Sequence, residues 1–67
     1  MKFNFRDKVR HRIDIKRGKI DIGTIIGMGL NNYCVQWENA GTMWNAEHNL
    51  VLHKRRKYNH PNTKLFI

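Results

Sequence analysis

Serine is missing from this chain, and cysteine and proline occur once each. The absence of serine removes the commonest hydroxyl nucleophile of hydrolytic enzymes. The single cysteine, Cys34, cannot form a disulfide within the chain, and it falls short of the cysteines that common zinc motifs supply. Cys34 lies in a segment with strand character and no activating motif, so we expect a buried apolar residue in a reducing compartment.

Acidic residues are few and widely spaced. The five carboxylates form no close pair suited to general acid–base chemistry; they are Asp7, Asp14, Asp21, Glu38 and Glu47. The histidines show no metal-ligand spacing; they are His11, His48, His53 and His60. We therefore expect a protein that is not an enzyme, with no catalytic residue, no metal and no cofactor.

Long apolar runs are also missing. No segment approaches the roughly 18 apolar residues that a membrane-spanning helix needs. The first residues, MKFNFRDKVRHR, lack the hydrophobic stretch of a secretory signal. We expect a cytoplasmic protein without a membrane partner, associated with the nucleoid if its source is a bacterium or a phage.

Positive charge is what the chain has in excess. Thirteen Lys and Arg against five Asp and Glu give a net charge of +8 at pH 7. The cations are segregated, because residues 1–19 and 54–67 hold all of them and residues 20–53 hold none. A solvated basic face kept for solubility is the alternative, but segregation in a chain with a pI near 10.3 favours a surface that binds a polyanion.

Residues 8–13, KVRHRI, alternate between charged and less polar side chains, which predicts a half-buried strand. With Val9 and Ile13 facing the core, the outer face carries a ladder of cations about 6 to 7 Å apart, formed by Lys8, Arg10 and Arg12. His11, on the inner side, is expected to fill space rather than bind a ligand. Such a ladder can follow a phosphate backbone.

The remaining segments predict a small β fold. Residues 14–22 are expected to form a mobile loop, and residues 23–29 a strongly bent strand flanked by glycines. Residues 33–38 and 42–45 form a hairpin around a turn at residues 39–41, followed by a short helical turn at 46–49 and a last strand at 50–53. The prediction is an all-β domain over residues 1–54, a five-stranded, strongly bent barrel, followed by a basic tail over 55–67.

The order of the segments DKVRHRI, GTIIG, NYCVQWENAG and TMWNAEHNLVL resembles the Src-homology-3-like (SH3-like) barrels, which include the Tudor, chromodomain and KOW-type domains. Within residues 5–52, the segments YCVQW, TMW and EHNL are similar to the YxVxW, TW and NL pattern of chromodomains. The resemblance implies that Trp37 stands where a peptide-reading aromatic cage has its tryptophan, and that Trp44 belongs to the core. In the chain itself the core is favoured for Tyr33 and Trp44, and Trp37 is open between core and surface.

The leading hypothesis is a nucleic-acid-binding protein that contacts phosphates with weak sequence preference. Duplex DNA is favoured over RNA, because a rigid row of cations suits a regular backbone. If the first and last strands are neighbours, the two basic segments merge into one stripe. The predicted binding residues are Lys8, Arg10, Arg12, Lys16, Arg17, Lys19, Lys54, Arg55, Arg56, Lys57 and Trp37.

A second hypothesis is a protein-interaction module. It would read a peptide through Trp37, or act as a viral or bacterial accessory protein that docks on polymerase, ribosome or nuclease. Both a monomer and a homodimer are compatible with the sequence, because open barrel edges can pair.

Overall fold

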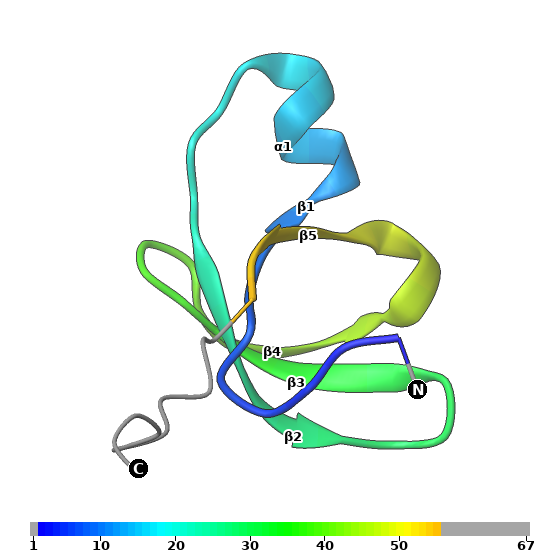
Figure 1. The fold of residues 1–67 in the computed structure, drawn as a ribbon. Coiled ribbons are helices and arrows are strands. Elements are labelled where there is room, and N and C mark those ends of the chain that lie inside the picture. The colour runs from blue at the N-terminus through cyan, green and yellow to red at the C-terminus, as the bar shows by residue number, and fades with distance from the viewer. Residues whose placement is uncertain (1, 56–67) are drawn as a thin grey trace, which may run out of the picture.

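Five antiparallel strands form one sheet in the order β4-β3-β2-β1-β5 (Figure 1). This arrangement is seen in a computed structural model of the chain that describes residues 2–55. The elements are β1 (Lys8–His11), α1 (Arg12–Arg17), β2 (Gly23–Met28), β3 (Asn32–Trp37), β4 (Gly41–Ala46), the 3-10 helix η1 (Glu47–Asn49) and β5 (Leu50–Lys54). The predicted all-β class, with five strands and one helical turn before the last strand, is confirmed. Within residues 2–55 no helix is long and apolar enough to span a membrane.

The hairpin of β3 and β4 is the most regular part of the sheet. Its strands pair in unbroken register from Asn32 opposite Ala46 to Trp37 opposite Gly41. Gly41 has a φ of 85°, which the turn requires and which glycine adopts without steric cost. On the other side of β3, the register with β2 shifts at Ile26, which forms a bulge. Bulges bend a strand, and this one curves the sheet around its inner face.

The first strand is shorter than predicted, because its last two residues belong to a helix. The strand ends at His11, whose extended backbone and Nδ1 atom cap α1 by accepting a hydrogen bond from the Ile13 N–H at 3.1 Å. Gly18 closes the helix in the left-handed conformation at a φ of 73°. The expected loop over residues 14–22 is therefore wrong in its first part. Ile13, expected in the core, is 44% exposed.

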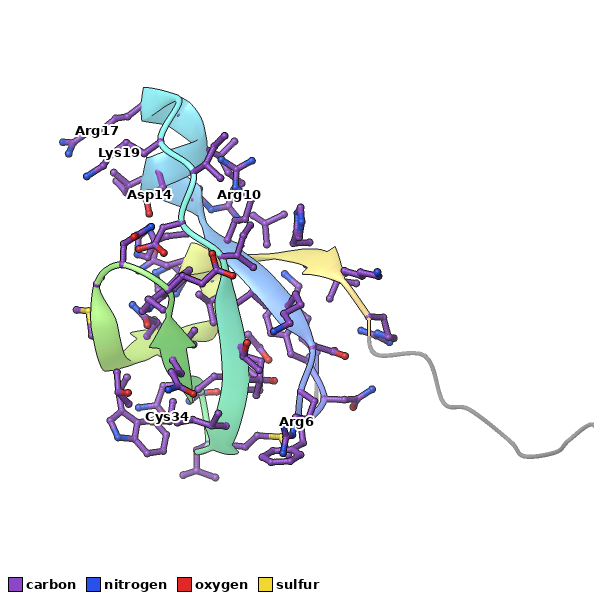
Figure 2. All side chains as sticks on the ribbon, turned by 90° about the vertical axis from the view of Figure 1, so that its left-hand side faces the viewer. Arg6, Arg10, Asp14, Arg17, Lys19 and Cys34 are labelled. Atoms are coloured by element: carbon purple, nitrogen blue, oxygen red, sulfur yellow. The ribbon has the colours of Figure 1, made fainter. Side chains whose placement is uncertain are left out.

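The helix stands beyond one end of the sheet, with Asp14 and Arg17 on it (Figure 2). Below it, β1 lies between β2 and β5, and Lys8 pairs with Thr24 on one side and with Lys54 on the other. The expectation that the first and last strands are neighbours is confirmed. The two basic segments of the sequence thus meet on adjacent strands.

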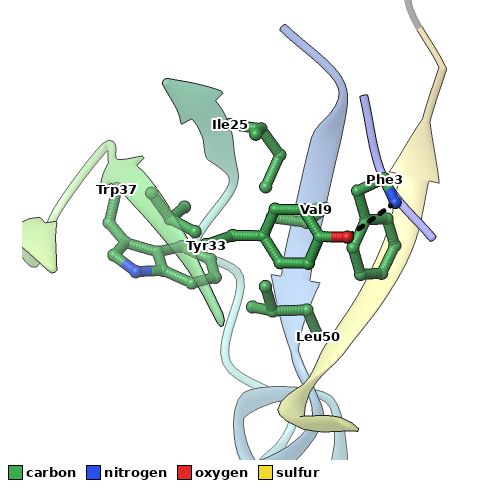
Figure 3. Packing of buried hydrophobic residues seen from close by; sticks show 7 residues of the cluster. Phe3, Val9, Ile25, Tyr33, Trp37 and Leu50 are labelled. Carbon is green, nitrogen blue, oxygen red and sulfur yellow. Dashed lines mark hydrogen bonds between the residues drawn. The ribbon is translucent and has the colours of Figure 1, made fainter. Parts of the chain in front are cut away.

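Seven apolar side chains fill the inner face of the sheet (Figure 3). They are Phe3, Val9, Ile25, Tyr33, Val35, Trp37 and Leu50. The core position of Tyr33 is confirmed, and Trp37, left open by the sequence, is buried with 5% of its surface exposed. The prediction for Trp44 is wrong, because it pairs with Cys34 on the outer face and is 57% exposed. Cys34 itself is half-buried.

The hydroxyl of Tyr33 ties the first residues of the chain to η1. Its oxygen accepts hydrogen bonds from the backbone N–H groups of Lys2 at 3.1 Å and Phe3 at 3.2 Å, and its proton is donated to Oε2 of Glu47 at 2.7 Å. The Phe3 ring meets the Tyr33 ring edge-on at 5.2 Å between centroids. The bond from Tyr33 lowers the pKa of Glu47 below its ordinary value of 4.5, against a smaller opposing effect of burial, and Lys2 lowers it further.

Glu47→Gln is expected to reduce stability at neutral pH and to have less effect in acid. A carboxylate whose pKa is lowered by folding stabilises the folded state above its unfolded pKa, and this contribution is lost as the pH falls through the folded pKa. Urea unfolding midpoints measured between about pH 7 and pH 3 test this: the gap between wild type and Glu47→Gln should narrow on acidification. In a Tyr33→Phe background, Glu47→Gln should reduce stability less. A difference in unfolding midpoint that does not change with pH would contradict the stabilising bond between Tyr33 and Glu47.

Candidate nucleic-acid interface

Cations from β1, α1 and the segment after α1 gather at one end of the molecule. The Arg10 guanidinium donates to the backbone oxygen of Lys19 at 2.6 Å, which fixes the segment after the helix against β1. Arg17 and Lys19 lie close to this contact, far from Arg6 at the opposite end (Figure 2). Lys16, Arg17 and Lys19 are exposed. We call the group of Arg10, Lys16, Arg17 and Lys19 the helix-end basic cluster.

The predicted ladder of three cations on β1 is not formed. Lys8 and Arg10 do share the outer face of β1, since they are two residues apart on a strand. Arg12 is the first residue of α1, and its Nε donates to the backbone oxygen of His48 at 3.0 Å. From Lys8 the cations therefore continue to Arg10 and the other members of the helix-end basic cluster, rather than along a straight strand.

Lys8 also belongs to a line of polar side chains that crosses the whole sheet. Directly paired residues of neighbouring strands lie on one face, and the strand registers place five such residues side by side. We call them the polar row: Thr42 on β4, Gln36 on β3, Thr24 on β2, Lys8 on β1 and Lys54 on β5. The row is about 19 Å wide at a strand spacing of about 4.8 Å. The Lys8 ammonium donates to the Thr24 hydroxyl at 2.6 Å, which orients it within the row.

The tail residues among the predicted site have different positions. Arg55 forms an ion pair with the buried carboxylate of Asp7, at 3.5 Å from Nε to Oδ2, and donates to the backbone oxygen of Lys2 at 3.3 Å. These contacts fix the end of β5 to the N-terminal turn, so Arg55 has a structural role. Arg56 and Lys57 lie outside the described residues.

The two tryptophans have opposite surroundings. Trp37 packs in the core and donates from its ring Nε1 to Oδ1 of Asn45 at 3.0 Å. Trp44 stands next to the polar row, two residues from Thr42 on the same face of β4. The sequence signal that could have identified Trp44 is the turn. With Trp37 opposite Gly41, residue 44 falls opposite Cys34, on the face of β3 that does not carry Tyr33, Val35 and Trp37.

A cleft of about 270 Å³ separates α1 from the β3–β4 hairpin, on the inner side of the sheet. Apolar and titratable side chains share its lining, which includes His11, Ile13, Asp14, Asp21, Trp37 and Met43. Asp21 is nearly buried and accepts a hydrogen bond from the Asn39 N–H at 3.0 Å. In residues 2–55, no three His, Cys, Asp or Glu side chains stand close enough together to hold a metal ion. Two carboxylates make this cleft a poor site for a phosphate backbone.

Comparison with protein-family models, with curated proteins and with solved structures finds no match to this chain.

Proposed function

We propose that this chain is a small nucleic-acid-binding protein that contacts phosphates with weak sequence preference. The observation that carries the proposal is the pairing of β1 with β5, which sets Lys8 beside Lys54 on the same face as Arg10. Arg10 in turn holds the segment that carries Lys19. Cations from both ends of the sequence thus lie along one side of the molecule, as a phosphate backbone requires.

The absence of acidic residues from the strands supports the same function. None of the five strands contains an Asp or a Glu, so no carboxylate repels phosphate within the outer face of the sheet. Glu38, just past the end of β3, is the closest acid along that strand. The preference for duplex DNA rested on a straight ladder that included Arg12. Because Arg12 belongs to α1, the cations alone no longer favour a duplex.

Binding is expected to weaken steeply with salt, because each phosphate neutralised by a cation releases counterions. If about four phosphates are contacted, a fourfold rise in salt lowers the association constant roughly 50- to 150-fold. Fluorescence anisotropy with a labelled DNA 20-mer of random sequence, at about 50 and 200 mM salt, measures this change in the association constant. An affinity that does not change with salt would overturn the proposal.

Charge reversal on α1 locates the contact. The double substitution Lys16→Glu and Arg17→Glu is expected to weaken binding and to reduce its salt slope, since both side chains are exposed. The matched control is Lys2→Glu with Arg6→Glu, which changes the net charge equally and includes Arg6 at the opposite end of the molecule (Figure 2). Arg55 is not a useful site for reversal, because its partner is the buried Asp7. An equal loss of affinity in the two double variants would mean that only the net charge matters, and would contradict a contact at α1.

A protein-interaction module is the second candidate, and the cleft beside α1 favours it. Asp14 and Asp21 in a partly apolar lining suit a basic peptide segment. Trp37 lines the cleft but is almost fully buried, so it offers only an edge. Pull-down from a nuclease-treated lysate separates the candidates: partners that persist, and that Asp14→Asn releases, favour the module.

A further inference from the structure

We infer that Trp44 stacks an unpaired base, so that the form of nucleic acid this chain selects is single-stranded. The inference rests on the proposed function and adds to it the strand form and a residue for base contact. Four features carry it: the position of the indole, the hollow beside it, the composition of the surrounding face, and the geometry of paired bases.

The indole of Trp44 lies across the sheet rather than standing away from it. A Cβ placed on Gly27 of β2 would be 3.8 Å from the Cη2 atom of Trp44, although Trp44 is on β4, two strands away. The ring therefore spans β3, above Cys34, with one side toward the sheet. More than half of the residue is exposed, so the other side of the ring is open to solvent. A flat aromatic surface held in this way suits a base.

Beside the indole is a hollow of about 540 Å³. It is lined by Leu30, Asn31, Asn32, Trp44, Asn45 and Ala46. The backbone here is fixed, because the oxygens of Asn31 and Asn32 accept hydrogen bonds from the N–H groups of Glu47 and Gly29 at 2.9 and 2.8 Å. The exposed side-chain amides of Asn31 and Asn32 carry donors and acceptors that suit a base edge.

The polar row links this aromatic site to the cations. Trp44 on β4 and Lys8 on β1 are separated by three strand spacings across the sheet and by two residues along it, or about 16 Å. Between them lie the side chains of Thr42, Gln36 and Thr24, which are neutral hydrogen-bonding groups. A strand with one base on Trp44 can thus run across the sheet and bring its phosphates to Lys8 and Lys54. Stacking on Trp44 and phosphate contacts to Lys8 and Lys54 thus act on the same strand of nucleic acid.

Duplex bases do not offer this contact. In a duplex each base is covered on both faces by its neighbours, and a protein must pay the unstacking energy before an aromatic ring can reach one. A single strand presents its bases freely, and stacking on aromatic side chains is the usual way such strands are held. The exposed indole therefore favours a single strand over a duplex.

The test compares labelled 20-nucleotide oligo(dT) with a 20-base-pair duplex, by anisotropy at about 50 and 200 mM salt. Trp44→Ala is expected to weaken oligo(dT) binding roughly 5- to 150-fold and to leave the salt slope unchanged, since the phosphate contacts persist. Trp44→Phe should retain part of the affinity, and duplex binding should change little. Met43→Ala is the matched control, because Met43 is also exposed on β4 but faces the opposite side.

A second variant tests the position of the ring without removing it. Gly27→Val places a Cβ 3.1 Å from Cβ of Cys34 and 3.8 Å from the indole, and its methyl groups should displace the ring from the sheet, lowering oligo(dT) affinity while Trp44 is retained. Thermal melting confirms that each variant is folded. Unchanged oligo(dT) affinity in Trp44→Ala, with salt-dependent binding intact, overturns the stacking inference and leaves the proposed function standing. If no nucleic acid binds at low salt, both fail.

Discussion

Trp37→Ala is expected to unfold the domain. The side chain is 5% exposed, packs within the core and bonds Asn45 through its ring N–H. Truncating a buried tryptophan to alanine costs about 3 to 5 kcal/mol, and the loss also leaves the Asn45 oxygen without its donor. A domain of this size has a total stability of roughly 3 to 10 kcal/mol, so the substitution consumes most of it. Circular dichroism at room temperature measures the loss of the fold.

The other tryptophan is the control for this experiment. Trp44→Ala removes a residue that is 57% exposed and should melt close to the wild type. Trp37→Phe retains most of the apolar volume and should cost much less than alanine. Similar melting temperatures for the two alanine variants would contradict the assignment of one tryptophan to the core and the other to the surface.

Gly23→Ala is the second substitution expected to be severe. A Cβ at this position would lie 2.3 Å from Cγ1 of Val35 and 2.8 Å from the Trp37 ring, both buried. Neither neighbour can move freely, because they are surrounded by the rest of the core. Overpacking of this kind costs about 3 kcal/mol. Urea unfolding should show a midpoint far below that of the wild type.

Gly41→Ala provides the comparison, because it introduces the same methyl group without a clash. Nothing lies within 4 Å of a Cβ at Gly41, so the loss of stability comes only from the φ of 85°, which alanine adopts with strain. We expect a loss of about 1 kcal/mol there. If Gly23→Ala is no more destabilising than Gly41→Ala, the close packing of β2 against Val35 and Trp37 is wrong.

The hairpin was the most predictable part of the fold, since its alternation and its turn residues favour the same structure. Residues 33, 35 and 37 share one face, as an alternating strand predicts, and the folded chain shows that this face is the inner one. The helix α1 was missed because residues 8–13 alternate through its start. His11 as a cap and Gly18 as a terminator were visible in the sequence, but they act through local hydrogen bonds that a two-residue period does not show.

The candidate site was predictable in its chemistry and less so in its geometry. Of the cations that the sequence assigned to the binding surface, Lys16 and Arg17 are exposed, whereas Lys8 and Arg10 are half-buried. The polar row depends on the registers of four strand pairs, which only the folded chain fixes. Arg55 could not be separated from the other cations by sequence, because its role depends on the position of Asp7.

The strand order also has a consequence for the time at which the cationic face is assembled. Strands β2, β3 and β4 form a meander of local contacts, which fold quickly. The first strand, by contrast, pairs with the last one, Lys8 with Lys54, and this closure must wait for β5 to leave the ribosome. A nascent chain that ends before β5 therefore carries Lys8 and Arg10 of β1 without Lys54 beside them. The cations of β1 and β5 therefore become neighbours only once β5 has been made and has docked beside β1.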